Sequence, residues 1–236
     1  MARTAAQSGI ATIAATPHLR ADFPGVHVRE LAGHCQRLRE ALAHERIPLQ
    51  LISGAEVSLV WALEASDEEL ALASYGQLGS DLLLETPFTP PAGLDQFIGV
   101  LQDKGYRVTL GHPERSRYFQ RDASLLRLLA SQGVLIQLNA DSLIGPGGGR
   151  QAKQLARELL ADGLVHAVAS DGHRGSSWRP VTRLAEAARE AAELVGPPRA
   201  RWLFEAAPAA IATGAELPAP PPITSKRRRR RLFGLR

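Results

Sequence analysis

The sequence predicts an α/β fold built on parallel strands. Six short, apolar, strand-like runs alternate with segments that repeat apolar residues at helical spacing. Glycine or proline stands at most of the joints, as at Gly105, Gly133 and Gly163. Alternation of this kind is typical of a parallel sheet covered by helices on both sides. About six such units in a chain of 236 residues favour a closed barrel over an open sheet.

Each element follows from its own pattern. The predicted strands are 10–15, 49–53, 81–84, 107–110, 134–138 and 165–169. Leu31, Cys35, Leu38 and Leu42 repeat every three or four residues and predict the first long helix. Further helices are predicted at 67–74, 94–104, 123–132, 151–161 and 182–194. Residues 2–9 fit the last turns of a helix that leads straight into the first strand, so we expect one β/α element of the barrel to be missing from this chain.

The composition excludes several classes of protein. Hydrophobic residues make up 44% and charged residues 22%, which provides for a sizeable core and excludes global disorder. Cys35 is the single cysteine, which excludes an intrachain disulfide and a multi-cysteine zinc site. Neither a membrane-length apolar run nor a secretory signal is present, so we expect a soluble cytoplasmic protein.

Positive charge is concentrated at the C-terminus. Seven of the 28 Lys and Arg lie in residues 226–236, so the rest carries 21 cations against 24 acids, a net charge of −3. That balance argues against a nucleic-acid partner. We expect a domain at 1–213, a Pro-rich linker at 214–225 and a basic tail at 226–236. The tail is a candidate for weak contact with an anionic membrane, and a solvated end is the alternative.

Polar residues collect where the predicted strands end. In a parallel barrel these ends face one mouth, where active sites are built. The candidate metal ligands there are His18, Glu56, Glu85, His112, Asp171 and His173. Imidazole and carboxylate without thiolate suit Mn²⁺, Fe or Zn²⁺.

Two arginines lie beside these ligands. Arg115 comes three residues after His112, and Arg179 comes six after His173. A guanidinium binds phosphate through a bidentate fork, so the pair suggests a phosphate-ester substrate, with surface salt bridges as the alternative. Cys35 lacks the arginine six residues later that a cysteine phosphatase needs, since Ala41 stands there. We therefore interpret it as a core residue.

In this order, the motifs resemble those of the PHP-domain phosphoesterases, and within them the tyrosine-protein phosphatases of bacterial capsule and exopolysaccharide clusters. The matching blocks are Ala15-Thr16-Pro17-His18, Gly54-Ala55-Glu56, Leu84-Glu85, Gly111-His112-Pro113-Glu114-Arg115-Ser116-Arg117-Tyr118, Leu138-Asn139-Ala140-Asp141-Ser142-Leu143 and Ala169-Ser170-Asp171-Gly172-His173. The resemblance runs from about residue 3 to about residue 212. Glu85, where other PHP branches have histidine, favours the tyrosine phosphatases.

The resemblance implies a distorted (β/α)7 TIM-like barrel with up to three divalent ions, often manganese. It implies that Glu56 bridges two ions, that Glu85 and His112 complete the second, and that Asp171 binds the first. His18 with His173 would hold the third ion.

The resemblance also implies a reaction. Arg115 and Arg179 would clamp the phosphate while an activated water attacks phosphorus, without a phosphoenzyme. The implied partner is a bacterial tyrosine kinase whose phosphotyrosines are hydrolysed to regulate capsule or exopolysaccharide synthesis. A phosphatase of a small metabolite such as histidinol phosphate is the enzymatic alternative, and a catalytically dead PHP binding module is the other.

The family pattern opens with a His-x-His pair on the first strand and an acidic residue in the next loop, and this chain has neither. The absent block coincides with the β/α element that the barrel lacks. We expect a start codon assigned too late, with a natural truncation as the alternative.

Overall fold

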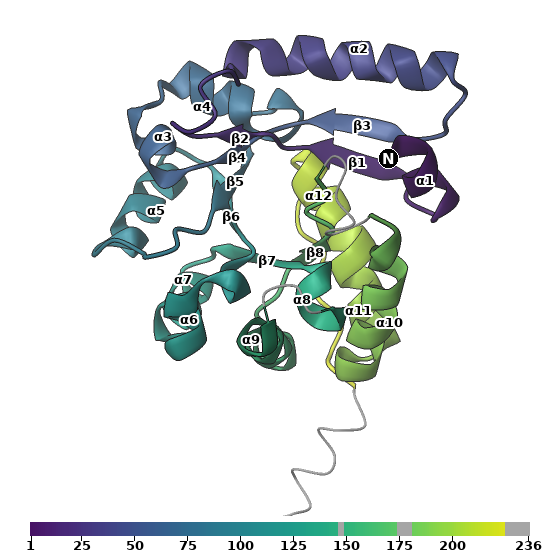
Figure 1. Ribbon diagram of the computed structural model, residues 1–236. Coiled ribbons are helices and arrows are strands. Elements are labelled where there is room, and N and C mark those ends of the chain that lie inside the picture. The colour runs from purple at the N-terminus through teal and green to yellow at the C-terminus, as the bar shows by residue number, and fades with distance from the viewer. Residues whose placement is uncertain (146–148, 174–180, 225–236) are drawn as a thin grey trace, which may run out of the picture.

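Parallel strands form the centre of the structure, a computed structural model that describes residues 1–145, 149–173 and 181–224 (Figure 1). The strands are β1 (Thr12–Ala15), β2 (His18–Leu19), β3 (Gln50–Ser53), β4 (Glu56–Val57), β5 (Asp81–Glu85), β6 (Arg107–Gly111), β7 (Leu135–Asn139) and β8 (Ala167–Ala169). β1 pairs with β3 in a small sheet, and the other strands form a second sheet in the order β2-β4-β5-β6-β7-β8. Every pairing is parallel, so the mixed α/β class that the sequence predicts is confirmed.

Helices connect and cover these strands. The α-helices are α1 (Ala2–Gln7), α2 (Leu31–His44), α3 (Leu59–Glu64), α4 (Asp67–Ala73), α5 (Leu94–Asp103), α6 (Arg117–Arg121), α7 (Ser124–Ser131), α8 (Ala140–Ile144), α9 (Gly149–Ala161), α10 (Leu184–Val195), α11 (Pro197–Arg201) and α12 (Ala207–Thr213). Short 3₁₀ turns are η1 (Val28–Glu30), η2 (Tyr75–Gln77), η3 (Pro113–Arg115) and η4 (Val181–Arg183), and η5 (Trp202–Ala206) is a π-helical turn. The helices predicted from periodicity are present within a few residues of their expected bounds. No helix of the described ranges is both long enough and apolar enough to span a membrane.

Each of the first two predicted strands is followed, after a short break, by a second short strand. This changes where two site residues lie. The sequence analysis put His18 and Glu56 in loops after strands, whereas the structure places them on β2 and β4. Pro17 has no N–H to donate, but its carbonyl accepts from the Glu56 amide at 3.1 Å. The Ser58 amide then donates to the Leu19 carbonyl at 3.1 Å, so parallel pairing resumes beyond the break.

The closed barrel is not confirmed. Among the described residues no strand pairing joins β8 to β1 or β2, which leaves the larger sheet open. The sheet is nevertheless strongly curved. This curvature shows in the rings of His18 on β2 and His173 after β8, which lie 6.1 Å apart. The segment after the last strand therefore reaches the first strand at the end that carries the polar residues.

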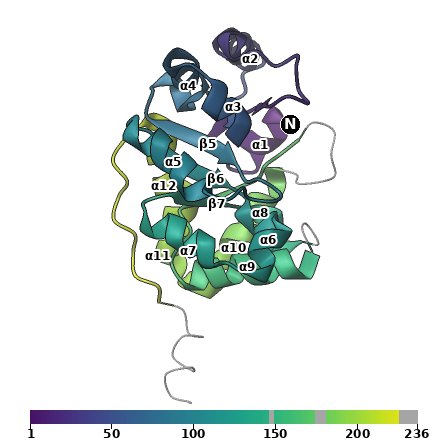
Figure 2. The same ribbon diagram turned by 90° about the vertical axis from the view of Figure 1, so that its left-hand side faces the viewer.

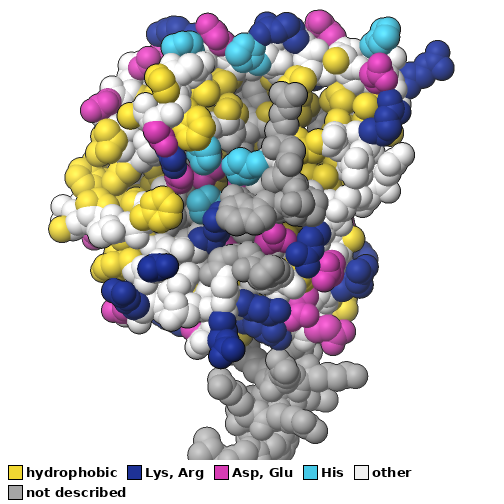
Figure 3. Space-filling model, viewed as in Figure 1, with side chains coloured by type: hydrophobic (Ala, Val, Ile, Leu, Met, Phe, Trp, Pro, Cys, Tyr) yellow, Lys and Arg dark blue, Asp and Glu magenta, His cyan; other side chains and the backbone are white. Residues whose placement is uncertain are grey.

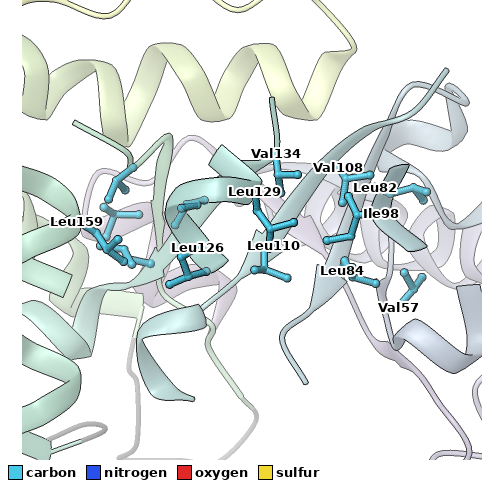
Figure 4. Packing of buried hydrophobic residues seen from close by; sticks show 14 of the residues in the cluster. Val57, Leu82, Leu84, Ile98, Val108, Leu110, Leu126, Leu129, Val134 and Leu159 are labelled. Atoms are coloured by element: carbon cyan, nitrogen blue, oxygen red, sulfur yellow. The ribbon is translucent and has the colours of Figure 1, made fainter. Parts of the chain in front are cut away.

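The core lies on both faces of the larger sheet, because alternate strand residues point to opposite sides. One face packs against helices, as Figure 4 shows for residues of β5, β6, α5 and α7. The labelled members are Val57, Leu82, Leu84, Ile98, Val108, Leu110, Leu126, Leu129, Val134 and Leu159. On the other face Leu83, Leu135 and Ala167 form a smaller cluster with Tyr75 and with Ile211 of α12. α12 thus packs against this second face of the sheet.

Residues 214–224 lie along the body, as the yellow trace in Figure 2 shows. The Trp202 indole donates to the Pro218 carbonyl at 2.8 Å, and the Arg199 guanidinium donates to the Pro221 carbonyl at 3.3 Å. Leu217 and Ile223 pack against the core. The predicted basic tail at 226–236 lies outside the described residues.

Candidate metal centre

Strand register brings His18, Glu56 and Glu85 to within two residues of one another near the C-terminal edge of the sheet. His18 of β2 stands opposite Glu56 of β4, and Glu85 at the end of β5 stands opposite Gly111 of β6. His112 follows Gly111 directly. The parallel pairing therefore gathers side chains that are far apart in the sequence.

His18, Glu56 and Glu85 form the most compact ligand group among the described residues. One ligand atom from each lies within 4.8 Å of the others. His18 Nδ1 is 3.6 Å from Glu56 Oε2 and 3.9 Å from Glu85 Oε2. That nitrogen is buried and has no hydrogen-bond partner within the described ranges. An orphaned imidazole nitrogen facing two carboxylates is a donor set that suits divalent cations.

His112 joins this group through Glu56. Its Nε2 lies 2.8 Å from Glu56 Oε1. Burial alone would raise the pKa of Glu56, but the hydrogen bond and charge of His112, with the charges of His18 and His173, hold it below its ordinary value. A side chain at Gly111 would meet Glu56 Oε1 at 3.5 Å and Leu83 at 3.3 Å, so glycine leaves room for the carboxylate.

Asp171 and His173 complete the same mouth from the segment after β8. Asp171 Oδ2 accepts from the Asn139 side-chain amide at 2.8 Å and lies 3.5 Å from Arg115 Nη1. His173 Nδ1 lies 2.9 Å from the Asp171 carbonyl. His112 and Asp171 both have left-handed backbones, with φ of 40° and 48°. Non-glycine residues in this region are uncommon and mark positions that the surrounding structure holds in place.

A buried carboxyl underlies the mouth. Glu114 is fully buried, and its Oε1 accepts from the Asn139 backbone amide at 3.0 Å and from Ser142 Oγ at 2.6 Å. Burial raises its pKa, and the Ser142 and Asn139 hydrogen bonds offset only part of that rise. Asn139 therefore links the buried carboxyl below it to Asp171 above it.

The ligands surround an open pocket of about 250 Å³. Its lining residues are His18, Glu85, Thr86, Phe88, His112, Arg115, Ser116, Asp171 and His173. Figure 3 shows histidine, acidic and basic side chains gathered on this face, with hydrophobic side chains beside them. Phe88 is 84% exposed at the rim, and its carbonyl accepts from Ser116 Oγ at 3.2 Å.

The structure thus brings the predicted ligands to one mouth, with Glu56 beneath the lining residues. Arg115 lines the pocket, whereas Arg179 lies outside the described residues. Cys35 is buried within α2 and does not line the pocket.

The sequence analysis missed Arg20, whose Nη1 donates to Glu85 Oε1 at 2.5 Å. Arg20 comes two residues after His18, so strand periodicity places both side chains on one face. That spacing is the signal that could have identified it.

Comparisons with known proteins agree with this arrangement. A family model described as "Capsular polysaccharide synthesis, CpsB/CapC" matches residues 1–213. The chain is 36% identical over 177 residues to the tyrosine-protein phosphatase YwqE of Bacillus subtilis, which covers 73% of this chain and 68% of that protein. It is 25% identical over 172 residues to the putative tyrosine-protein phosphatase CapC of Staphylococcus aureus, covering 72% and 67%.

A solved structure is also similar. It belongs to a crystallographic study of YwqE from Bacillus subtilis and CpsB from Streptococcus pneumoniae, described as unique metal-dependent tyrosine phosphatases. The TM-score is 0.76 at 30% identity, with 95% of this chain and 90% of that chain covered. The chain therefore belongs to the CpsB/CapC family of capsular polysaccharide synthesis.

Proposed function

We propose that this chain is a cytoplasmic, metal-dependent protein-tyrosine phosphatase that dephosphorylates a partner kinase and so regulates capsule or exopolysaccharide synthesis. The observation that carries the proposal is the compact group of His18, Glu56 and Glu85, with its orphaned buried nitrogen. Membership of the CpsB/CapC family and relatives named as tyrosine-protein phosphatases support it.

In a complete barrel the proposed centre would hold up to three divalent ions. Glu56 would be a ligand to two of them, since both of its oxygens face the site: Oε1 lies 2.8 Å from His112 Nε2 and Oε2 lies 3.6 Å from His18 Nδ1. Glu85 and His112 would complete the site of the second ion, Asp171 would bind the first, and His18 with His173 would hold the third. We favour manganese, since imidazole and carboxylate ligands suit it, and iron and zinc are the alternatives.

Divalent ions at such a site supply an activated water and neutralise charge on the transferring phosphoryl group. The role of Arg115 is to orient the ester. Its contact with Asp171 is 3.5 Å long, so the guanidinium is held loosely and can turn toward a phosphate entering the pocket. We propose the same role for Arg179. Asn139 fixes Asp171 through the hydrogen bond at 2.8 Å.

We also propose that the curved sheet is an arc of a distorted seven-unit β/α barrel. The 6.1 Å approach of His18 and His173 and the interior cluster around Tyr75 support this interpretation. The division into a domain at 1–213, a Pro-rich segment at 214–225 and a basic tail at 226–236 stays a proposal, and the family match ends at residue 213.

The test compares substrates with and without metal. We expect turnover of a phosphotyrosine peptide by the chain, loss of turnover after chelation, and recovery on addition of Mn²⁺. Faster turnover of histidinol phosphate than of the peptide would favour a metabolite phosphatase. Metal binding without turnover of either substrate would leave a binding module and contradict the proposal.

A further inference from the structure

Glu85 has two oxygens in different environments. Oε1 accepts from Arg20 Nη1 at 2.5 Å, whereas Oε2 lies 3.9 Å from His18 Nδ1, within the compact ligand group. One oxygen is therefore engaged by a cation, and the other faces the proposed ion.

Arg20 is itself held in place. Its Nε and Nη2 donate to the two oxygens of Asp22, each at 2.6 Å. Its guanidinium lies 5.2 Å from the centre of the Phe23 ring, and that ring stacks on His18 at a centroid distance of 5.2 Å. We call residues 20–23 the 20–23 bracket. It contacts two proposed ligands, Glu85 and His18.

Charge balance explains why Asp22 belongs to the bracket. A bare guanidinium beside divalent ions would repel them. Asp22 carries the compensating negative charge and occupies the Nε/Nη2 edge of the guanidinium, so Glu85 is engaged through Nη1. Without Asp22 the Nε/Nη2 edge would also be free, and the guanidinium could turn to engage both oxygens of Glu85 and withdraw Oε2 from the ion.

We propose that Arg20 is a positioning residue that holds Glu85 by one oxygen and reserves the other for a divalent ion, with Asp22 restraining Arg20. This inference rests on the metal centre of the proposed function. Partners that orient a metal ligand typically change metal affinity by about 10- to 100-fold when they are removed.

The first experiment is calorimetric titration of Mn²⁺ into metal-depleted protein. We expect Arg20→Gln to weaken Mn²⁺ affinity by about 10- to 100-fold. Arg20→Lys should recover part of it, because one ammonium can bind Glu85 but cannot form the fork with Asp22. Asp22→Asn should also weaken binding.

Arg29 provides the matched control. It forms an equally bidentate pair with Glu68, at 2.6 and 3.0 Å, on an exposed surface outside the pocket. Arg29→Gln should leave Mn²⁺ affinity unchanged. Melts of the metal-free proteins should show similar stability for both variants.

The decisive readout is coupling to Glu85. In a Glu85→Gln background, Arg20→Gln should change Mn²⁺ affinity little, because the residue that it positions has already lost its charge. Equal losses in both backgrounds, or an unchanged affinity in Arg20→Gln, would overturn the inference even if the enzyme hydrolyses phosphotyrosine. Arg20-dependent Mn²⁺ binding without turnover would instead contradict the proposed function alone. A chain that binds no Mn²⁺ would overturn both.

Discussion

Replacing Glu114 removes the buried carboxyl beneath the candidate metal centre. Glu114→Ala eliminates hydrogen bonds from the Asn139 amide and from Ser142 Oγ, and it leaves a buried N–H without its partner. An unsatisfied buried donor costs about 1–3 kcal/mol. Loss of packed methylene groups adds roughly 0.8 kcal/mol each. The variant no longer has the desolvation cost of a buried carboxyl, which offsets part of this. We therefore expect a loss of about 2–4 kcal/mol in the free energy of unfolding.

Glu114→Gln keeps an oxygen that can accept the same two hydrogen bonds. Burial raises the folded-state pKa of Glu114 above the ordinary value of 4.5. The stability that the wild-type carboxyl contributes is therefore present below pH 4.5 and is lost as the pH rises through the folded-state pKa. Glutamine does not titrate, so the stability of the variant relative to wild type should increase as the pH rises.

Urea unfolding of wild type, Glu114→Gln and Glu114→Ala between pH 4 and pH 8 measures both effects. We expect the glutamine variant to lie within about 1 kcal/mol of wild type at the acid end and the alanine variant well below both. An equal cost for glutamine and alanine, or a wild-type-to-glutamine difference that does not change with pH, would refute this account of the carboxyl.

Further predictions concern the phosphate clamp, a buried histidine and the C-terminal segment. Arg115→Ala should lower kcat/KM for a phosphotyrosine peptide by about 100-fold without loss of metal, with Arg127→Ala as the surface control; metal loss would contradict the assigned role. Burial and, secondarily, the charge of Arg199 lower the pKa of His166 from 6.5 to about 4. Wild-type stability should therefore fall as the pH drops from 6.5 to 4, by up to about 3 kcal/mol, and His166→Asn should flatten that dependence in unfolding titrations. Deletion of 214–236 should lower the melting temperature more than deletion of 226–236, because only the longer deletion removes the contacts with Trp202 and Arg199. Sedimentation with anionic vesicles should show weaker binding after the shorter deletion, and equal binding would exclude a membrane role for the tail.

Much of the fold follows from local patterns. The strand segments were predicted because buried parallel strands are short, continuous apolar runs. The mouth was predicted because parallel strand C-termini meet at one edge, which is how Glu85 and His112 were identified together.

Non-local contacts account for what the sequence analysis missed. The pairing of β2 with β4 depends on a hydrogen bond between the Glu56 amide and the Pro17 carbonyl, which are far apart in the chain. Arg20 acquires its role only when β5 brings Glu85 to it. Residues 214–224 have the composition of a linker, and their packing depends on Trp202 and Arg199.

Glu56 is the residue on which the proposed centre depends, because its oxygens face both His112 and His18. Glu56→Gln keeps the shape and removes the charge. The most direct test measures bound Mn²⁺ and phosphotyrosine-peptide turnover in the same preparations of wild type, Glu56→Gln and Cys35→Ser. We expect both quantities to fall together by at least about 100-fold in Glu56→Gln and to be retained in Cys35→Ser. A Glu56→Gln protein that keeps its metal and most of its turnover, or an inactive but folded Cys35→Ser protein, would contradict the metal-centred account.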